Sequence, residues 1–202
     1  MKTSHRLLFT LVALLGLSAT AVAQEVGLKS NALYLATSTL NAGMDFRLAD
    51  HWSASLHFGY NPWAFPNSRS ATWADGTTVD ANPKMAHFLV MPEVKWWPCR
   101  AFERHAIGLH GIYTTYNLAA LPFPKSFNDH RYRGDAYGVG LSWGYQWAMG
   151  ERWGVEFSLG AGYLWTRYTQ YEAGACGTEL KQVQKGIFAP TKLALNFIYY
   201  IK

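Results

Sequence analysis

The sequence has little charge, few cysteines and, after its first 23 residues, no long hydrophobic run. Charged residues make up 15% of the 202 positions, and Cys occurs only twice. A helix that spans a membrane needs about 20 apolar residues in a row, so no such helix is expected beyond the N-terminus. The formal net charge of +5 falls to +3 without the two basic residues of the N-terminal segment. The basic pI is therefore weak support for nucleic acid as a partner, and none is expected.

The N-terminus has the pattern of a secretory signal peptide. Two basic residues precede an apolar run from Leu7 to Leu17, and Ala21 and Ala23 place small residues where a signal peptidase cleaves. The apolar run, about 11 residues long, is too short for a membrane-spanning helix. We expect residues 1–23 to be removed on export and residues 24–202 to form one domain.

Aromatic residues and glycine are abundant, and the aromatic residues alternate with small or polar ones. The sequence is 16% aromatic, with nine tryptophans, and contains 18 glycines. In the stretch 153–168, Trp153 and Phe157 share one parity, whereas Glu156 and Gly160 share the other. Because successive side chains of a strand point to opposite faces, this stretch predicts a strand with one large apolar face and one small or polar face.

The same alternation predicts eight strands, three of them from weaker patterns. Their positions are 26–36, 41–48, 52–60, 84–98, 104–118, 137–147, 153–168 and 192–201. Abundant aromatic residues in short alternating segments are typical of a membrane barrel. The predicted fold is all-β: a closed antiparallel eight-stranded transmembrane β-barrel, connected as an up-and-down meander in the outer membrane.

Connection lengths separate the two ends of this predicted barrel. Short turns are expected near 49–51, 98–103 and 149–151, and long polar links at 61–83, 119–131 and 169–185. The long links fall on alternate connections, so they share one end, as the outer loops of outer-membrane barrels do. The first hairpin, near 37–39, is a short exception. Pro92 and Pro190 lie within strands and lack ladder donors, so bulges are expected there.

Aromatic side chains are expected in two belts at the ends of the barrel, where water meets lipid. The short-turn end would hold Trp52, Trp96, Trp97, Trp147 and Trp153. The loop end would hold Tyr60, Trp63, Tyr113, Tyr137, Trp165 and Tyr168. The alternative is a soluble sandwich or lipocalin-like barrel, in which the large apolar side chains would face inward.

Short aromatic motifs along the chain carry a family resemblance. They are Leu28-Lys29-Ser30-Asn31, Gly59-Tyr60-Asn61-Pro62-Trp63, Pro92-Glu93-Val94-Lys95-Trp96-Trp97-Pro98-Cys99, Gly108-Leu109-His110-Gly111 and Gly140-Leu141-Ser142-Trp143-Gly144-Tyr145. Together they resemble an uncharacterised Bacteroidetes family, domain of unknown function 3575, over nearly all of the chain after residue 23. The resemblance implies a small OmpA-like barrel, without catalytic residues to carry over, and an association of some members with fimbrial or surface-assembly gene clusters. The C-terminus departs from many outer-membrane barrels because it lacks a terminal Phe.

Charged residues on the inward face of the predicted strands form one set. They are Lys29, Asp45, Arg47, Glu93, Lys95, Glu156 and Lys192, and all but Lys192 are expected in the half near the short turns. A barrel of about eight strands is just filled by its side chains, so we expect a salt-bridged plug and no open pore. Inward glycines would leave room for the long side chains. The loss of one charge leaves another buried and unpaired, at a cost of roughly 3–5 kcal/mol. Arg47→Ala is therefore expected to lower the unfolding midpoint.

Three histidines and one Ser–Asp–His set are the candidates for chemistry in the sequence. His57, His87 and His110 are expected to face the lumen without the tight spacing of metal ligands, so neither a metal nor another cofactor is expected. Ser126, Asp129 and His130 lie together on a predicted outer loop. A triad is defined by geometry rather than by closeness in sequence, and we expect the chain not to be an enzyme. A lipid-modifying hydrolase or acyltransferase and a narrow conduit remain alternatives.

The predicted outer loops carry aromatic residues that are candidates for contact with a surface or fimbrial protein. These residues are Trp63, Phe65, Trp73, Phe123 and Phe127. They could equally pack on the rim or dip into the outer-membrane lipid that should surround the barrel. Cys99 and Cys176 are expected at opposite ends of the barrel, beyond the roughly 7 Å between Cα atoms that a disulfide allows, so no bridge between them is predicted.

Overall fold

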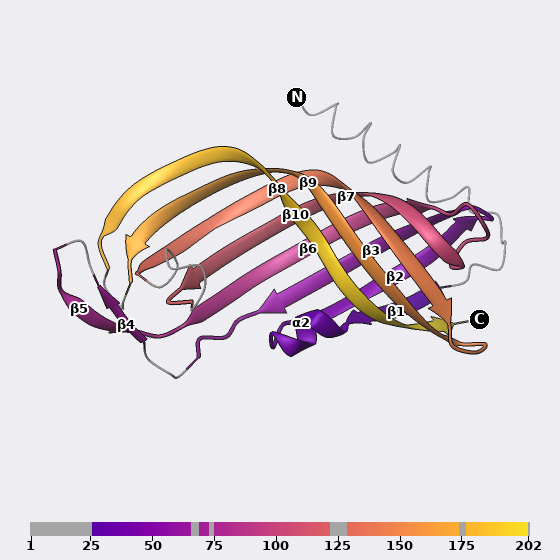
Figure 1. The fold of residues 1–202 in the computed structure, drawn as a ribbon, viewed down its shortest axis with the longest axis horizontal. Coiled ribbons are helices and arrows are strands. Elements are labelled where there is room, and N and C mark those ends of the chain that lie inside the picture. Colours follow the sequence, from indigo (N-terminus) through magenta and orange to yellow (C-terminus); the bar gives the residue numbers. More distant parts are fainter. Residues whose placement is uncertain (1–25, 66–68, 73–74, 122–128, 174–176, 202) are drawn as a thin grey trace, which may run out of the picture.

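The computed structural model describes residues 26–65, 69–72, 75–121, 129–173 and 177–201, and its main feature is a closed barrel of eight antiparallel strands (Figure 1). The strands are β1 (Val26–Asn31), β2 (Leu40–Ala49), β3 (Trp52–Asn61), β6 (Lys84–Trp96), β7 (Arg104–Ala119), β8 (His130–Ala148), β9 (Trp153–Glu172) and β10 (Glu179–Ile201). Each barrel strand pairs with the next one along the chain, and β1 closes the ring against β10. The predicted eight-stranded up-and-down barrel is therefore confirmed.

A short helix and a two-stranded hairpin are not part of the ring of strands. The helix α2 (Ala32–Ala36) follows β1, and the strands β4 (Arg69–Thr72) and β5 (Thr78–Ala81) form a hairpin between β3 and β6. The prediction of a strand over 26–36 is thus wrong beyond Asn31. The Asn31 side-chain oxygen accepts from the N–H of Leu33 at 3.1 Å, which caps the helix and ends the strand. None of the helices in the described ranges has the length and apolarity to cross a membrane.

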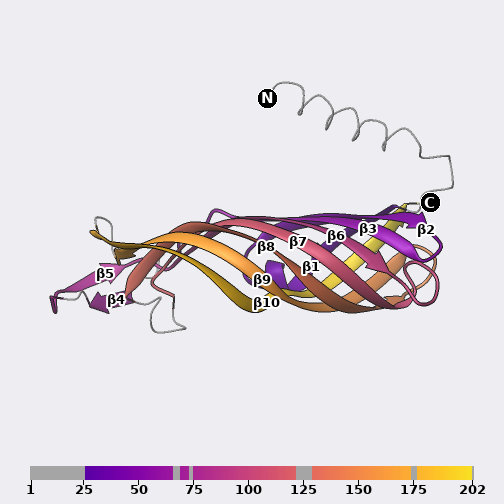
Figure 2. The ribbon, with the colours of Figure 1, turned by 90° about the horizontal axis from the view of Figure 1, so that it is seen from above.

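The barrel is uneven, because its strands lengthen from six residues in β1 to 23 in β10. Residues 115–119 of β7, 130–136 of β8, 166–172 of β9 and 179–186 of β10 continue past the ring as a curved sheet, which we call the raised sheet. Figures 1 and 2 show these strands running toward the end that carries the β4–β5 hairpin, away from the C-terminus.

The raised sheet corrects the predicted link at 169–185. The β9–β10 ladder runs through most of that segment, from Tyr171↔Glu179 to Thr166↔Lys185. Both faces of this ladder carry polar side chains, so the alternation that reveals a strand between two different environments is missing here. The predicted leader, residues 1–23, lies outside the described residues.

The two strand prolines behave differently. The β9–β10 register shifts between Pro190 and Lys192, which confirms the bulge predicted there. The bulge predicted at Pro92 is wrong, because Pro92 pairs with Leu56 in an unbroken register. On its other side the β6–β7 ladder is interrupted between Val90 and Glu93 and resumes without a shift. The missing N–H of Pro92 is thus accommodated by a local loss of pairing rather than by an extra residue.

The side chains are arranged inside out relative to a soluble barrel. Large apolar residues such as Leu141, Val139 and Trp153 are exposed on the outer face, whereas Glu156 and Ser142 are buried inside. The alternative with apolar side chains facing inward therefore does not describe this molecule. Because small interior side chains alternate with bulky exterior ones, the polar groups of opposite strands approach one another across the lumen.

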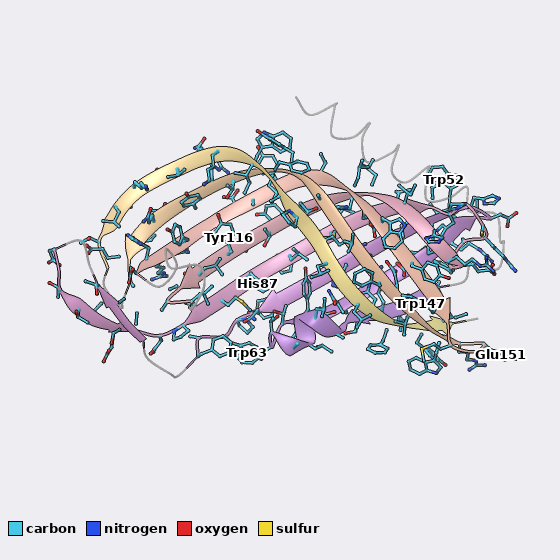
Figure 3. The ribbon with its side chains drawn as sticks, viewed as in Figure 1. Trp52, Trp63, His87, Tyr116, Trp147 and Glu151 are labelled. Carbon is cyan, nitrogen blue, oxygen red and sulfur yellow. The ribbon has the colours of Figure 1, made fainter. Side chains whose placement is uncertain are left out.

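Four of the five tryptophans expected at the short-turn end, Trp52, Trp96, Trp147 and Trp153, are exposed there. Figure 3 shows Trp52 and Trp147 toward the end marked by Glu151, and Tyr116 and His87 farther along the barrel. The placement of Trp97 in this belt is wrong, since its side chain is only 1% exposed. Adjacent residues of an extended chain point to opposite faces, so Trp96 and Trp97 cannot both face outward.

Exposed aromatic residues also mark the loop end of the outer face: Tyr60, Tyr113, Tyr137 and Trp165. Tyr137 and Trp165 stack, with their ring centroids 5.8 Å apart. Tyr168 was expected beside them but lies on the inner face, where its ring centroid is 5.5 Å from that of Tyr132. Its even position on β9 opposes that of Trp165, for the same reason of alternation.

Candidate functional site

Three ion pairs fill the lumen and form what we call the charge cluster: two of them cross it, and Lys29–Asp45 joins the adjacent strands β1 and β2. The shortest distances are 2.6 Å in each of the pairs Lys29–Asp45, Lys95–Glu156 and Lys192–Glu93. Longer contacts link the last two pairs, at 3.8 Å for Lys95–Glu93 and 4.0 Å for Lys192–Glu156. The six side chains come from β1, β2, β6, β9 and β10 and hold equal numbers of opposite charges. The cluster is therefore neutral as a whole.

Hydroxyl groups complete the charge cluster. The Ser142 hydroxyl donates to Glu93 Oε1 at 2.5 Å, and Ser55 donates to Asp45 while accepting from Lys29. All six charged side chains are almost completely buried. Because an ionised group costs several kcal/mol to bury unless it is paired and hydrogen-bonded, the pairs and hydroxyls are what allow six charges to fill the lumen.

Arg47 lies nearer the short turns and makes none of the ion pairs within the charge cluster. Its guanidinium donates to the Ala101 carbonyl at 3.3 Å. The structure thus brings six of the seven predicted inward charges together and gives Arg47 a separate contact with the 97–103 turn. Lys192, expected apart from the others, is a full member because it reaches Glu93 across the lumen.

An aromatic plug closes the lumen at the short-turn end. Trp97, Phe102 and Tyr200 pack together, with ring centroids 5.9 Å apart for the first two and 5.4 Å apart for the last two. The Trp97 indole donates to Ser53, and Lys95 Nζ lies 5.7 Å from its ring centroid. Phe102 adopts a φ of +72°, which few non-glycine residues tolerate. The sequence interpretation missed this plug, although the parity of Trp97 relative to Lys95 was a signal for it.

The lumen is also covered toward the loops. Tyr34 of α2 lies over His57, with ring centroids 5.7 Å apart. His110 is fully buried and lies 2.8 Å from the Thr191 hydroxyl. A cavity of about 20 Å³ remains beneath Tyr34, enough for about one water molecule. His110 fits because Gly140 and Gly160 face it, and a Cβ at either glycine would approach its ring within 2.9 Å.

The three candidate histidines do not converge. His57 and His110 are lumen residues, whereas His87 lies beside the Met85 carbonyl, toward the loops. No group of three or more His, Cys, Asp or Glu side chains in the described part of the chain is placed to hold a metal ion.

The outer surface of the barrel has a second candidate site, a hollow of about 1000 Å³ near the raised sheet. Its walls include aromatic residues from the loop end of the apolar surface and basic residues from the raised sheet. Tyr60, Phe88 and Tyr113 represent the first group, and Arg131 and Arg133 the second. The hollow is thus amphipathic, unlike the charge cluster.

A model of one protein family, described as a protein of unknown function (DUF3575), matches residues 8–201. The chain belongs to the DUF3575 family. No curated protein matches it. Because the family description gives no activity, the roles of individual residues in this DUF3575 protein rest on its geometry.

The candidate triad of this DUF3575 protein is only partly described, because Ser126 lies outside the described residues. Asp129 is a structural tie: its carboxylate accepts from the Thr72 N–H at 3.4 Å, and its carbonyl accepts from the Ala173 N–H at 3.2 Å. His130 is the first residue of β8. Asp129 thereby joins the β4–β5 hairpin to the connection that follows β9.

Two of the five candidate contact residues in the loops are described. Trp63 lies near α2 (Figure 3) and donates its indole N–H to the Ser38 carbonyl at 2.8 Å. With Phe65 it borders an open hollow of about 460 Å³. The other three, Trp73, Phe123 and Phe127, lie outside the described residues. Cys99 is exposed with a free thiol, and Cys176 lies outside the described residues, so the predicted lack of a bridge stays a prediction.

Proposed function

We propose that this DUF3575 protein is an integral outer-membrane protein, exported by its leader, that anchors the raised sheet at the cell surface and presents it to another surface protein. The observation that carries the proposal is the inverted arrangement of side chains. Six charges are buried in the lumen, while a continuous band of aromatic and aliphatic side chains is exposed outside. Water would not stabilise such a band, whereas lipid would.

The height of the band fits a membrane. On β9 the outer face is apolar from Trp153 to Trp165, twelve residues farther along the strand. At about 3.3 Å per residue this is about 40 Å of strand. A strand tilt of about 45° reduces it to about 28 Å of height, close to the roughly 25 Å apolar band of outer-membrane barrels. Where β1 pairs with β10, from Val26↔Ile201 to Asn31↔Asn196, closure of the ring satisfies the backbone groups of both strands within such a band.

The two closures of the lumen favour an anchor over a conduit. The aromatic plug, the charge cluster and Tyr34 lie in succession between the short turns and the loops. An ion would have to displace paired buried charges as well as aromatic side chains to pass. We therefore expect no conductance when the protein is placed in planar bilayers.

The surface offered to a partner is the free edge of β10. β1 pairs with β10 only as far as Asn196, and the Asn31 side chain then bonds the Leu193 carbonyl and the Leu195 N–H in place of a strand. From Glu179 to Gly186, no strand of the described residues pairs with that side of β10. An unpaired edge is a template for an added strand, so the partner would contribute an extended segment.

Heat-modifiable migration tests the anchor. The protein in isolated outer membranes should migrate differently on SDS gels before and after boiling, because a closed barrel resists SDS until it is heated. Recovery in the soluble periplasmic fraction, without a migration shift, would contradict the proposal.

Cross-linking in intact cells tests the edge. A photoreactive residue at Gln184, which is exposed on this part of β10, should form one discrete adduct with a surface protein. The same group at Leu141, which is 64% exposed on the apolar band, is the matched control and should form none. Identical adducts at both positions, or none at Gln184 in a protein that shows the heat shift, would rule out the edge as the contact surface.

A further inference from the structure

The outer face of the barrel changes character within two residues along its strands. The neighbours Tyr113, Tyr137 and Trp165 form an aromatic row across β7, β8 and β9. Two residues farther along the same strands, and on the same face, the row is Thr115, Asp135 and Arg167. The following rows are Asn117, Arg133 and Thr169, then Ala119, Arg131 and Tyr171. The aromatic row is thus the upper boundary of the apolar band, and basic residues begin directly above it.

Four basic side chains border the hollow above this boundary: Lys84, Arg131, Arg133 and Arg167. Lys84 joins them because it pairs with Ala119, next to Arg131 in the ladder. We call these four residues the basic rim. Asp135 is the one carboxylate among the described residues that line the hollow, so four positive charges face one negative charge. The excess of three positive charges favours an anionic ligand.

The arginines of the basic rim are held to different degrees. Arg131 donates Nε to Asn117 at 2.9 Å, and its guanidinium lies 5.8 Å from the ring centroid of Tyr171. Arg167 approaches Asp135 at 3.6 Å but remains well exposed. Arg133 is exposed and makes no ion pair with the described residues. The Arg131 side chain is therefore preorganised before any ligand binds, while Arg133 and Arg167 keep N–H groups available for a ligand.

The hollow also selects for a ligand with an apolar part. Tyr60, Phe88 and Tyr113 line the side of the hollow that continues into the apolar band. A small anion would use only the basic side. A lipid would use both sides, with its acyl chains along the aromatic row and its headgroup against the arginines.

We propose that the basic rim binds the phosphorylated headgroup of a membrane lipid in the leaflet nearest the loops. Guanidinium groups bind phosphate through paired N–H donors and stay charged at any physiological pH. The position fits, since the rim begins one row above the aromatic boundary, where headgroups replace acyl chains. This inference rests on the proposed placement in the outer membrane.

The test compares lipid binding by the full chain and by two matched variants in detergent. The probe is diphosphoryl lipid A, with its dephosphorylated form and inorganic phosphate as the other arms. Wild type should bind the diphosphoryl form about tenfold or more tightly than the dephosphorylated form, and the triple variant Arg131→Gln, Arg133→Gln, Arg167→Gln should lose that preference. The control variant Lys181→Gln, Lys185→Gln removes two charges from the inner face of the raised sheet and should retain it.

The outcomes separate this inference from the proposed function. If the triple variant keeps the wild-type preference for diphosphoryl lipid A, the lipid site is overturned. Full competition by inorganic phosphate at matched concentration would also overturn it, because it would indicate a site for free anions. Each protein is first checked for the heat shift, which confirms that the variant has a folded barrel. Fractionation of cells tests placement in the outer membrane by itself, so a barrel that is in that membrane yet shows no phosphate preference contradicts the basic rim alone.

Discussion

The closed ring and the raised sheet are built from the same strands but differ in what their two faces meet. In the ring, β9 turns Glu156 toward buried charges and Trp153 toward the exposed apolar band. In the raised sheet, β9 turns Arg167 to one side, where it approaches Asp135, and Tyr168 to the other, where Lys185 lies over its ring. The backbone pairing continues without a break from one region to the other. Strand pairing and the alternation of apolar with polar side chains are thus separate properties, and only the ring shows both.

The difference also concerns how stability is distributed. Each strand of the ring pairs with a neighbour on both sides over at least part of its length, and ion pairs hold the interior of the ring. β10 has no partner strand on one side beyond Asn196, including all of its part of the raised sheet. The contacts of its side chains there, such as that of Lys185 with the Tyr168 ring, lie near solvent. Substitutions should therefore be costly in the ring and mild in the raised sheet.

The largest effect is expected from Glu156→Leu, which leaves Lys95 buried without its closest carboxylate. The free energy of unfolding should fall by about 3–5 kcal/mol, measured by urea unfolding in lipid or detergent. The double variant Glu156→Leu, Lys95→Met removes the whole pair and leaves the two other pairs balanced, so it should recover most of the loss. An unchanged free energy of unfolding in Glu156→Leu would contradict the greater cost expected for substitutions in the ring than in the raised sheet.

Trp97→Ala should cost about 3 kcal/mol, because it empties the aromatic plug. The neighbouring Trp96 faces outward and gives a matched control of equal size. In the same urea experiment, Trp96→Ala should shift the midpoint much less. Equal shifts for the two variants would mean that the plug does not support the ring.

Arg47→Ala is expected to lower stability by about 1.5 kcal/mol, since it removes a charged donor from the Ala101 carbonyl at the edge of the plug. This loss is smaller than for members of the charge cluster, because Arg47 makes none of the ion pairs within it. Its unfolding midpoint should lie between those of Trp97→Ala and wild type. A loss as large as that of Glu156→Leu would place Arg47 within the cluster energetically.

The smallest effect is expected from Lys185→Ala in the raised sheet. It removes a contact of the Lys185 ammonium with the Tyr168 ring at the surface, and stability should stay within about 0.5 kcal/mol of wild type. A loss comparable to those in the ring would erase the distinction between the two regions. The heat shift of this variant should be unchanged.

Much of the ring was predictable from residue types alone. Alternation placed Glu156 inside and Trp153 outside, because a strand between unlike environments must separate its side chains by parity. The same parity grouped the lumen charges, six of which do pair. The expectations for Trp97 and Tyr168 were wrong because they did not follow this parity. The positions of both residues relative to their exposed neighbours already place them on the inner face.

The sequence by itself determined the number of barrel strands, their connection order and the polarity of each face, since these depend on local periodicity and on turn lengths. The tertiary structure decided which charges meet, because the partners Lys95 and Glu156 are far apart in the chain and the stagger of the strands sets their depth. It also decided that Tyr34 covers His57 and that β10 extends far beyond the end of β1. Those features depend on how the ring closes, and closure is a property of all eight strands at once.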